Sequence, residues 1–321
     1  MSISEFDLIR QYFADATASR HDVLLGIGDD CALLQSPAGA ALAVSMDTLV
    51  EGRHFLPGTD PESLGHKALA VNLSDLAAMG ADPAWATLAL TLPGADTAWL
   101  GAFMQGFSAL AAEYGVQLVG GDTTRGPLSI TVQVHGFVDP DSALKRGGGK
   151  AGDLLFLSGS IGDAGLALLR AQGAAPSDAE DGHLRERLDR PIPRVTLGRL
   201  LAGRASAAID VSDGLIADLE HVCTASGTGA RVNLGSLPLS PAVATECARG
   251  NWQPALSGGD DYELLFSISP ERVESLLSIC LEAGQPVKEI GCLVADSGIV
   301  LVYPDGRPSE EIPHGFDHFR T

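Results

Sequence analysis

The residues best suited to chemistry lie in an acidic, glycine-rich segment that follows a predicted strand. Val116–Val119 is a short apolar run typical of a buried strand, and Gly120-Gly121-Asp122-Thr123-Thr124 follows it directly. Two glycines allow a sharp turn or a close approach of the backbone to a ligand. The Asp122 carboxylate and the two hydroxyls after it are oxygen donors, which Mg²⁺ prefers when it bridges phosphates to a protein.

Similar acidic segments recur along the chain. Gly26–Asp30, Asp210–Gly214 and Gly258–Asp261 each place carboxylates beside glycine, and Asp47 follows another apolar run. A single Asp-Gly pair is ordinary turn chemistry. Because four such segments occur together with Asp47, we predict that they contribute to one shared metal–phosphate site.

Strands and helices that could position these groups alternate in the first half of the chain, which is typical of an α/β fold. The helix expected at 61–79 carries Asp75 among apolar neighbours, and a buried Asp is costly unless it is paired or coordinated. Asp75 is therefore either held in that way or faces water. The predicted helices cover residues 4–13, 61–79 and 96–114, and the predicted strands cover residues 23–27, 41–45, 84–92, 116–119 and 128–138.

A basic, flexible segment, Lys145-Arg146-Gly147-Gly148-Gly149-Lys150, interrupts the alternation. It is not a Walker motif, because no glycine stands five residues before the Gly-Lys pair and Ala151 follows where Ser or Thr is required. We predict a domain boundary here, with an N-terminal metal- and ATP-binding domain at 1–145 and a C-terminal α/β domain at 146–321 that completes the nucleotide and substrate site. Arg146 is expected to reach a phosphate.

The second half repeats the mixture of strands and helices. Ser212 and Asp213 precede the helix expected at 215–225, where free backbone N–H groups could face a phosphate. The alternative is that one of them is a plain N-cap. The other predicted helices cover 163–172, 195–201 and 270–283, and the predicted strands cover 154–157, 207–209, 231–234, 262–268, 287–293 and 299–303.

The chain has 321 residues, of which 45% are hydrophobic, so it can bury a large core and a length prior suggests about two domains. Lys plus Arg number 21 and Asp plus Glu number 41, so the formal net charge is −20. Such a surface is a poor match for nucleic acid or an anionic membrane. A bound anionic nucleotide would need cations between itself and the protein.

The cysteine pattern and the hydropathy indicate the cellular compartment in which the protein is expected. The five cysteines are scattered without zinc-ligand spacing, which favours a reduced, cytosolic thiol set. No apolar run reaches the roughly 18 residues of a membrane span, and the acidic N-terminus lacks the apolar region of a signal peptide. We predict a cytoplasmic protein that binds neither nucleic acid nor a membrane.

Over essentially its full length the sequence resembles the thiamine-monophosphate kinases of the aminoimidazole ribonucleotide synthetase-like superfamily. The segments Ala70–Gly80 and Gly120–Thr124 are shared, in looser form, with aminoimidazole ribonucleotide synthetase and selenophosphate synthetase. The complete ordered set is specific to the thiamine enzymes. It comprises Gly26–Ala32, Asp47–Val50, His54-Phe55, Ala70–Gly80, Gly120–Thr124, Asp210–Leu215 and Ser257–Leu264.

The resemblance implies a reaction and an architecture. It implies direct, in-line transfer of a phosphoryl group from ATP to thiamine monophosphate, giving thiamine diphosphate and ADP, with several Mg²⁺ ions per site. It implies a two-domain α/β (α+β) fold of the aminoimidazole ribonucleotide synthetase type. In that fold the N-terminal sheets of two subunits pair into a barrel, so a homodimer is expected.

The resemblance also implies roles for individual residues, with Asp122, Asp213 and Arg146 in the catalytic role. The expected ATP contacts are Gly121, Asp122, Arg146 and Ser212. The expected contacts to the thiamine substrate are His54, Asp260 and Phe316. The expected metal ligands are Asp30, Ser45, the Met46 backbone, Asp47, Asp75, Asp122, Asp210 and Asp213.

Three positions depart from the family's pattern. Asp260 stands where the family usually has Glu, so its reach is one methylene shorter. Met46 replaces a frequent Thr, which is tolerable only if the backbone carbonyl is the ligand. Phe316 stands near a frequent Tyr or Trp, so stacking is retained but a polar hydrogen bond is lost.

Two other functions fit the residues less well. One is a different ATP-dependent enzyme of the same superfamily, of the aminoimidazole ribonucleotide synthetase or selenophosphate synthetase type; selenide chemistry would favour a reactive Cys near the N-terminus, and the first Cys here is Cys31. The other is a non-catalytic protein that binds divalent cations, against which the sequence has no EF-hand spacing.

Overall fold

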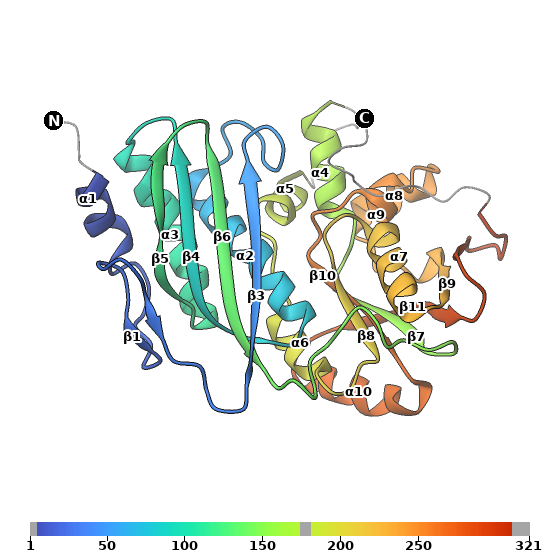
Figure 1. Cartoon of the computed structure of the whole chain (residues 1–321). Coiled ribbons are helices and arrows are strands. Elements are labelled where there is room, and N and C mark those ends of the chain that lie inside the picture. The colour runs from blue at the N-terminus through green and yellow to red at the C-terminus, as the bar shows by residue number, and fades with distance from the viewer. Residues whose placement is uncertain (1–4, 174–180, 310–321) are drawn as a thin grey trace. The chain divides into compact units, whose positions relative to one another are not determined.

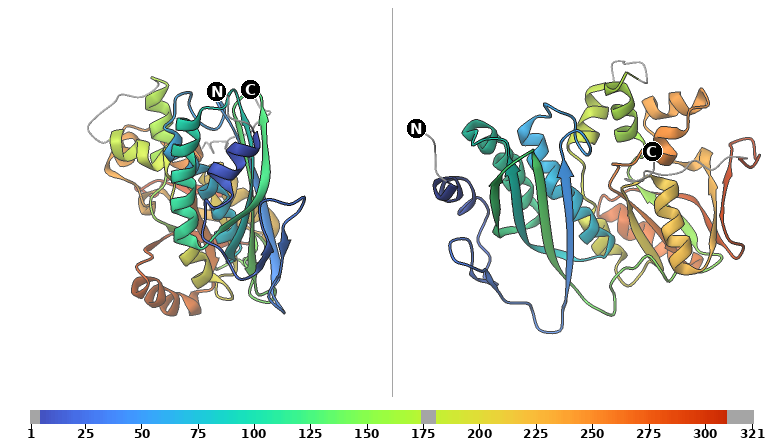
Figure 2. Two further views of the ribbon diagram at one scale, coloured as in Figure 1. Left: turned by 90° about the vertical axis from the view of Figure 1, so that its left-hand side faces the viewer. Right: turned by 45° about the horizontal axis from the view of Figure 1, so that its top comes forward.

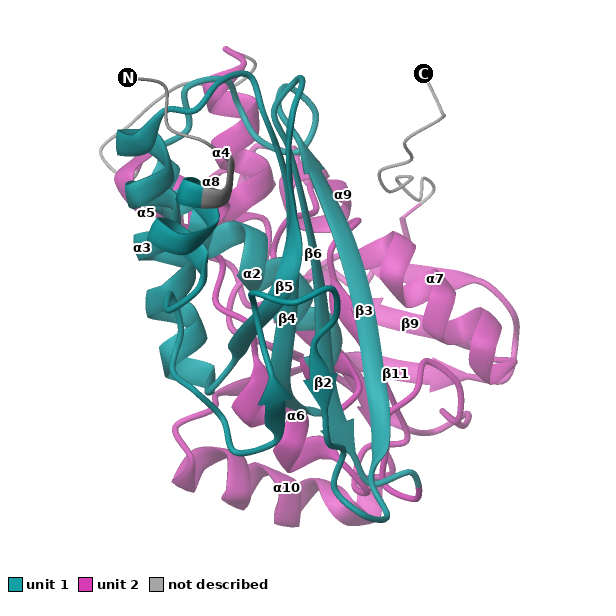
Figure 3. Ribbon diagram, turned by 60° about the vertical axis from the view of Figure 1, so that its left-hand side comes forward, with its two compact units in different colours: residues 1–76, 81–140 teal, residues 77–80, 141–321 magenta. Residues whose placement is uncertain are grey.

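The structure, a computed structural model, describes residues 5–173 and 181–309. The chain divides into two compact units, coloured separately in Figure 3. Unit 1 comprises residues 1–76 and 81–140, and unit 2 comprises residues 77–80 and 141–321. Both units combine a sheet with packed helices, and the predicted α/β class is confirmed.

Unit 1 is a four-stranded sheet with two long helices on one face (Figure 1; Figure 2, left). Its strand order is β3–β6–β4–β5, in which β4 and β5 are parallel and the other neighbours are antiparallel. Along β6, alternate residues such as Ile130, Val132 and Val134 are buried under the helices. The elements are β3 (Ala41–Val50), α2 (Pro61–Ala78), β4 (Asp82–Leu92), α3 (Thr97–Tyr114), β5 (Gln117–Arg125) and β6 (Ser129–Val138).

The two helices of unit 1 are defined by local sequence and by close packing. Asp96 caps α3 by accepting the backbone N–H groups of Ala98 and Trp99, and the helix ends at Gly115 in the left-handed conformation. Gly65 of α2 and Gly106 of α3 lie at the crossing, where a Cβ atom would come within 1.9 and 1.8 Å of a carbonyl oxygen of the other helix. The small residues therefore let the two helices form one tight layer.

The other face of this sheet is only partly covered. The short hairpin β1 (Val23–Leu25) and β2 (Leu33–Leu34) packs its side chains against Trp85 and Phe137. Along edge strand β3, by contrast, Leu42, Val44 and Met46 are 47, 53 and 59% exposed. The helix expected at 4–13 is a short α1 (Glu5–Leu8) followed by a π-helical turn, η1 (Ile9–Phe13).

Unit 2 is built on a six-stranded sheet of order β12–β9–β11–β7–β10–β8, antiparallel except for β12 beside β9. Side chains of α4, α7, α8 and α9 fill the core on one face. On the other face Phe156 and Phe266 stack with ring centroids 5.6 Å apart. The strands are β7 (Leu154–Ser158), β8 (Ala207–Val211), β9 (Gly229–Asn233), β10 (Glu263–Ile268), β11 (Val287–Val294) and β12 (Ile299–Val302). The helices are α4 (Asp163–Ala171), α5 (Asp181–Asp189), α6 (Val195–Leu201), α7 (Leu215–Ser226), η2 (Leu234–Ser236), α8 (Pro241–Ala248), α9 (Gln253–Ser257) and α10 (Pro270–Glu282).

Among the predicted strand ends that were wrong, two concern site carboxylates of unit 1. The expected turn at Gly120–Thr124 is part of β5, which continues to Arg125 because it pairs in parallel with β4 past a register shift at Ala86/Thr87. Asp47 likewise lies within β3 and not after it, because β3 pairs with β6 as far as Val50. Both carboxylates therefore project from paired strands, which hold them more rigidly than turns would.

In the part of the chain that the structure describes, no helix is both long and apolar enough to cross a membrane.

Candidate active site

The first acidic cluster surrounds a cavity of about 450 Å³ at the β5 edge of unit 1. Asp29 and Asp30 reach it from the loop after β1, and Asp122 reaches it from β5. Gly121 is required here by close approach, because a Cβ atom at this position would lie 1.9 Å from the carbonyl oxygen of Leu88 on β4. The predicted acidic segments Gly26–Asp30 and Gly120–Thr124 thus meet within unit 1.

The second cluster lies at the opposite edge of the same sheet, between β3 and α2. Ser45 donates its hydroxyl hydrogen bond to Asp75, which is half-buried. The backbone N–H of Asp47 donates to the side-chain oxygen of Asn72 at 3.0 Å, and the Asn72 amide donates to Ala68 at 3.0 Å. Of the two alternatives for Asp75, the paired one is correct.

Strand register separates these two clusters. Asp47 pairs with Val132, Val132 with Leu88, and Leu88 with Gly121, so Asp47 and Asp122 lie about three strand spacings, roughly 14 Å, apart. Asp122 instead shares its row with Ala89, Thr131 and Thr48. Because side chains alternate along a strand, Asp47 faces α2 and Asp122 faces the other side of the sheet. Unit 1 of a single chain therefore does not place Asp47 beside Asp122.

Two other predicted residues lie near β3. His54 is in the turn after the strand, where its Nδ1 accepts the backbone N–H of Val50 at 3.0 Å. The Met46 side chain lies on the face away from Asp75 and is 59% exposed. The Met46 side chain therefore lies on the opposite face of β3 from the Ser45–Asp75 pair.

The acidic segments Asp210–Gly214 and Gly258–Asp261 meet in unit 2. The N–H of Asp260 donates to the Ser212 carbonyl, and the N–H of Tyr262 donates to the Val211 carbonyl, both at 2.8 Å. Leu264 on β10 pairs with Asp210 on β8. Asp210, Ser212, Asp213 and Asp260, which the sequence predicted as site residues, are thus gathered at one end of these two strands.

Asp218 is a carboxylate of this cluster that the sequence analysis missed. It is 3% exposed, and its Oδ2 accepts the backbone N–H groups of Ser212 at 3.0 Å and Asp213 at 3.1 Å. The N-cap of α7 is Gly214, so neither Ser212 nor Asp213 caps the helix. The available signal was an Asp within the apolar first turn of a helix, next to an acidic segment.

Crowding of negative charge is the main electrostatic feature here. Burial first, and then the charges of Asp210 and Asp213, raise the pKa of Asp218 to about 8, against the lowering effect of the two N–H donors. The native carboxyl therefore retains a proton at pH values where an unfolded chain would lose it. This locates a concentration of negative charge around the Asp210–Gly214 segment.

Asp218 should give the metal-free protein a characteristic pH dependence of stability. Since its folded-state pKa of about 8 lies above its ordinary value of 3.8, the unfolded state loses the proton first as the pH rises from 4 to 8. Asp218 then lowers the free energy of unfolding over that window, by an order of a few kcal/mol at the upper end. Asp218→Asn retains an oxygen acceptor without the charge, so it should be the more stable protein at pH 8, with the difference vanishing toward pH 4. Urea unfolding in EDTA between these limits measures this, and parallel pH profiles would contradict it.

The donor chemistry of these clusters suits Mg²⁺. Within residues 5–173 and 181–309, no three carboxylate, imidazole or thiolate side chains form a group that could hold a metal ion. The Asp210, Asp213 and Asp218 carboxylates are oxygen donors, however, and their mutual repulsion is what a divalent cation would offset.

Of two further predicted residues, one is not brought to the unit 2 cluster and the other is not described. The Lys145 carbonyl accepts the N–H of Ala208 at 2.9 Å, so exposed Arg146 lies near the start of β8. Ser212 follows the far end of β8, which at about 3.3 Å per residue is roughly 16 Å away. The second residue, Phe316, lies outside the described residues.

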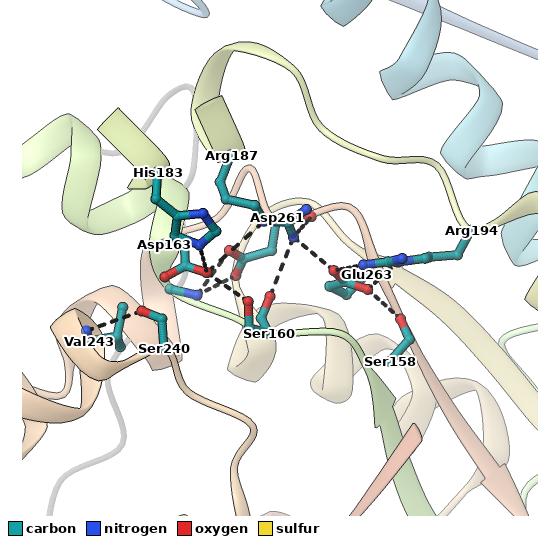
Figure 4. Close-up of polar contacts among 11 residues, drawn as sticks. Ser158, Ser160, Asp163, His183, Arg187, Arg194, Ser240, Val243, Asp261 and Glu263 are labelled. Carbon is teal, nitrogen blue, oxygen red and sulfur yellow. Dashed lines mark hydrogen bonds and ion pairs between the residues drawn. The ribbon is translucent and has the colours of Figure 1, made fainter. Parts of the chain in front are cut away.

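A network of buried charges surrounds Asp261, the last residue of the Gly258–Asp261 segment (Figure 4). Glu263 is fully buried and accepts hydrogen bonds from Arg187 at 2.7 Å, from Arg194 at 2.6 Å and from Ser158. Asp261 is 3% exposed and accepts the N–H of Gly162 at 2.9 Å. Asp261 therefore points away from Asp260, into the unit.

Both units match domains of one family of known proteins. Residues 28–138 match the family model described as AIR synthase related protein, N-terminal domain, and residues 150–304 match its C-terminal domain. The sequence is 50% identical to a thiamine-monophosphate kinase of Salmonella typhimurium over 327 residues, covering 100% of both chains. The structure matches that of a Stenotrophomonas maltophilia thiamine-monophosphate kinase with a TM-score of 0.86 and 46% identity, over 96% of this chain and 99% of the other. A structure of AaThiL complexed with AMPPCP and TMP matches with a TM-score of 0.76 and 32% identity, over 88% and 89% of the two chains.

Proposed function

Because the chain belongs to the thiamine-monophosphate kinases of the AIR synthase related family, and is thus an enzyme of ATP-dependent phosphorylation of thiamine monophosphate, we propose that its acidic clusters carry out this reaction with Mg²⁺ and by direct in-line transfer. The observation that best supports the proposal is the meeting of Asp210, Asp213 and Asp218 at one end of β8, where the buried Asp218 carboxyl accepts the backbone N–H groups of Ser212 and Asp213.

The residues take four roles. Gly121, Asp122, Arg146 and Ser212 contact ATP. His54 and Asp260 contact the thiamine substrate, and Phe316 is proposed to join them. Asp122, Asp213 and Arg146 act at the transferred phosphoryl group. The metal ligands are Asp30, Ser45, the Met46 backbone, Asp47, Asp75, Asp122, Asp210 and Asp213.

The chemistry requires two anions to approach an acidic protein. Bound Mg²⁺ supplies positive charge that neutralises the phosphates and the charge that develops on the transferred group. The side chains hold the two phosphates in line, and such positioning supplies much of the acceleration in phosphoryl transfer. The attacking oxygen belongs to a phosphate that is already ionised at neutral pH, so the side chains do not need to provide a strong general base.

We also propose that the protein acts as a homodimer through the sheets of unit 1. The exposed apolar row Leu42, Val44 and Met46 on edge strand β3 is a surface that a second copy would bury. Since Asp47 and Asp122 lie on opposite faces and edges of one sheet, a second copy is also the means of bringing the two kinds of cluster together. The thiamine site would then draw Asp47 and Asp122 from different chains.

The test is product analysis with the purified protein, ATP and Mg²⁺. Thiamine monophosphate should yield thiamine diphosphate and ADP in equal amounts, whereas formylglycinamidine ribonucleotide and selenide should not stimulate ADP release. ATP made chiral at the γ-phosphorus with oxygen isotopes should show inversion, because a single in-line transfer inverts the phosphorus. Retention would indicate a phosphorylated enzyme intermediate and contradict direct transfer.

A further inference from the structure

The turn that presents Asp260 has an unfavourable backbone conformation. Asp260 has φ of 61° and Tyr262 has φ of 51°, and in the described part of the chain these are the two non-glycine residues in the left-handed region. Such conformations cost on the order of 1–3 kcal/mol each and persist only when the surroundings enforce them. Contacts with neighbouring residues must therefore stabilise the backbone conformation of the turn at residues 260–262.

Asp261, the residue between them, is the anchor on the inner side. Both of its carboxylate oxygens lie within hydrogen-bond distance of the Gly162 N–H, at 2.9 and 3.0 Å, where α4 begins (Figure 4). Arg187, which is bound to Glu263, also lies 3.5 Å from the Asp261 carbonyl oxygen. The side chain of Asp261 is thus fixed by the N-cap of α4, and its main-chain carbonyl lies beside Arg187 of α5.

The outer side of the turn is held by β8 and by Tyr262. The backbone N–H groups of Asp260 and Tyr262 donate to Ser212 and Val211, as described above. The Tyr262 ring is 8% exposed, so it is fixed by packing, and its hydroxyl donates to Oδ1 of Asp260 at 3.0 Å. The Asp260 carboxylate therefore has a defined direction relative to the Asp210–Gly214 segment.

We propose that Asp261 and Tyr262 are positioning residues that orient the Asp260 carboxylate toward thiamine monophosphate. Asp261 enforces the left-handed turn, and the Tyr262 hydroxyl sets the rotation of the carboxylate. The inference rests on the proposed function in one respect, namely that Asp260 contacts the substrate. Neither residue is among the proposed ATP contacts, so we expect an effect specific to one of the two substrates.

The experiment is a double-mutant cycle of Tyr262→Phe and Asp260→Ala, read as KM and kcat for each substrate. Hydrogen bonds to charged groups contribute about 1.5–3 kcal/mol, so Tyr262→Phe should raise KM for thiamine monophosphate about tenfold or more. The kcat and the KM for ATP should remain within about twofold. In the Asp260→Ala background, Tyr262→Phe should cause no further change, because its effect passes through Asp260. Tyr114→Phe, at the end of α3 in unit 1, is the matched control for loss of a phenolic hydroxyl.

Asp261 is tested with a pair of variants. Asp261→Ala should raise the same KM, and Asp261→Asn, which retains an oxygen acceptor for Gly162, should restore it; circular dichroism establishes that each is folded. If Asp261→Ala does not fold, the comparison of Asp261→Asn with the wild type and the Tyr262 cycle decide the matter.

The possible failures are distinguishable. A full Tyr262→Phe effect in the Asp260→Ala background, or an Asp260→Ala variant with normal KM for thiamine monophosphate, would overturn the positioning role while leaving the kinase activity intact. Absence of thiamine diphosphate formation by the wild-type protein would overturn the proposed function itself.

Discussion

Replacing Asp122 with alanine is expected to lower kcat for thiamine diphosphate formation by on the order of 10³-fold, a typical loss when a group that stabilises transition-state charge is removed. Asp122 projects from paired strand β5 into the cavity that Asp29 and Asp30 also line. The side chain is exposed, so its loss leaves no hole in the core and the fold should be retained. Measurement of kcat with circular dichroism and thermal unfolding of the same sample checks both parts.

Glu113→Ala is the matched control, because it removes an exposed carboxylate from α3 in the same unit. It should leave kcat within about twofold, as surface substitutions usually do. Near-normal turnover by folded Asp122→Ala would contradict the site as placed here.

Mixing Asp122→Ala with Asp47→Ala then tests the origin of the two clusters. If one site takes Asp47 and Asp122 from different copies, random re-association of equal amounts gives half heterodimers with one intact site each, so about a quarter of the wild-type activity returns. If both carboxylates come from one chain, every site in the mixture lacks one of them, and activity stays at the level of the single variants.

The sequence predicted candidate site residues as groups where the chemically important side chains are close together along the chain. The carboxylate segments around Asp30, Asp122, Asp210 and Asp260 were identified because glycine and oxygen donors recur together. Their meeting in two places was only partly predictable, since it depends on strand pairing. Register alone decides that Asp47 and Asp122 face opposite sides of one sheet, and a single sequence does not encode register locally.

The carboxylates that the sequence could not sort are those whose partners lie far along the chain. Asp260 and Asp261 are adjacent and chemically identical, yet one is at the surface of the site and the other binds Gly162, 99 residues away. Asp218 was missed because its partners, Ser212 and Asp213, use only backbone N–H groups, which leave no trace in residue type. Tertiary context, and not local propensity, assigns such residues to catalysis or to support.

Glu263 illustrates the energetic side of this support. Its side chain is fully buried, and it is surrounded by Arg187 and Arg194, whose side chains are only 10 and 19% exposed. A buried pair of this kind contributes little net stability compared with apolar residues of equal size, because both charges lose their hydration. Removing one partner is a different matter, since the remaining charges then stay in a poorly hydrated site without compensation.

Glu263→Ala should therefore lower the free energy of unfolding of unit 2 by about 3–5 kcal/mol, the usual range for breaking a buried ion pair. The control is Glu246→Ala, because Glu246 is also buried but its partner Arg249 has a side chain that is 63% exposed and can regain water; its loss should cost about 1 kcal/mol or less. Hydrogen exchange followed by mass spectrometry separates the two units, and peptides covering β7 and β10 should lose protection in Glu263→Ala while the α2 and α3 peptides of unit 1 keep theirs. If the two substitutions cost the same, the buried charge network around Glu263 does not stabilise unit 2 more than a partly exposed ion pair does.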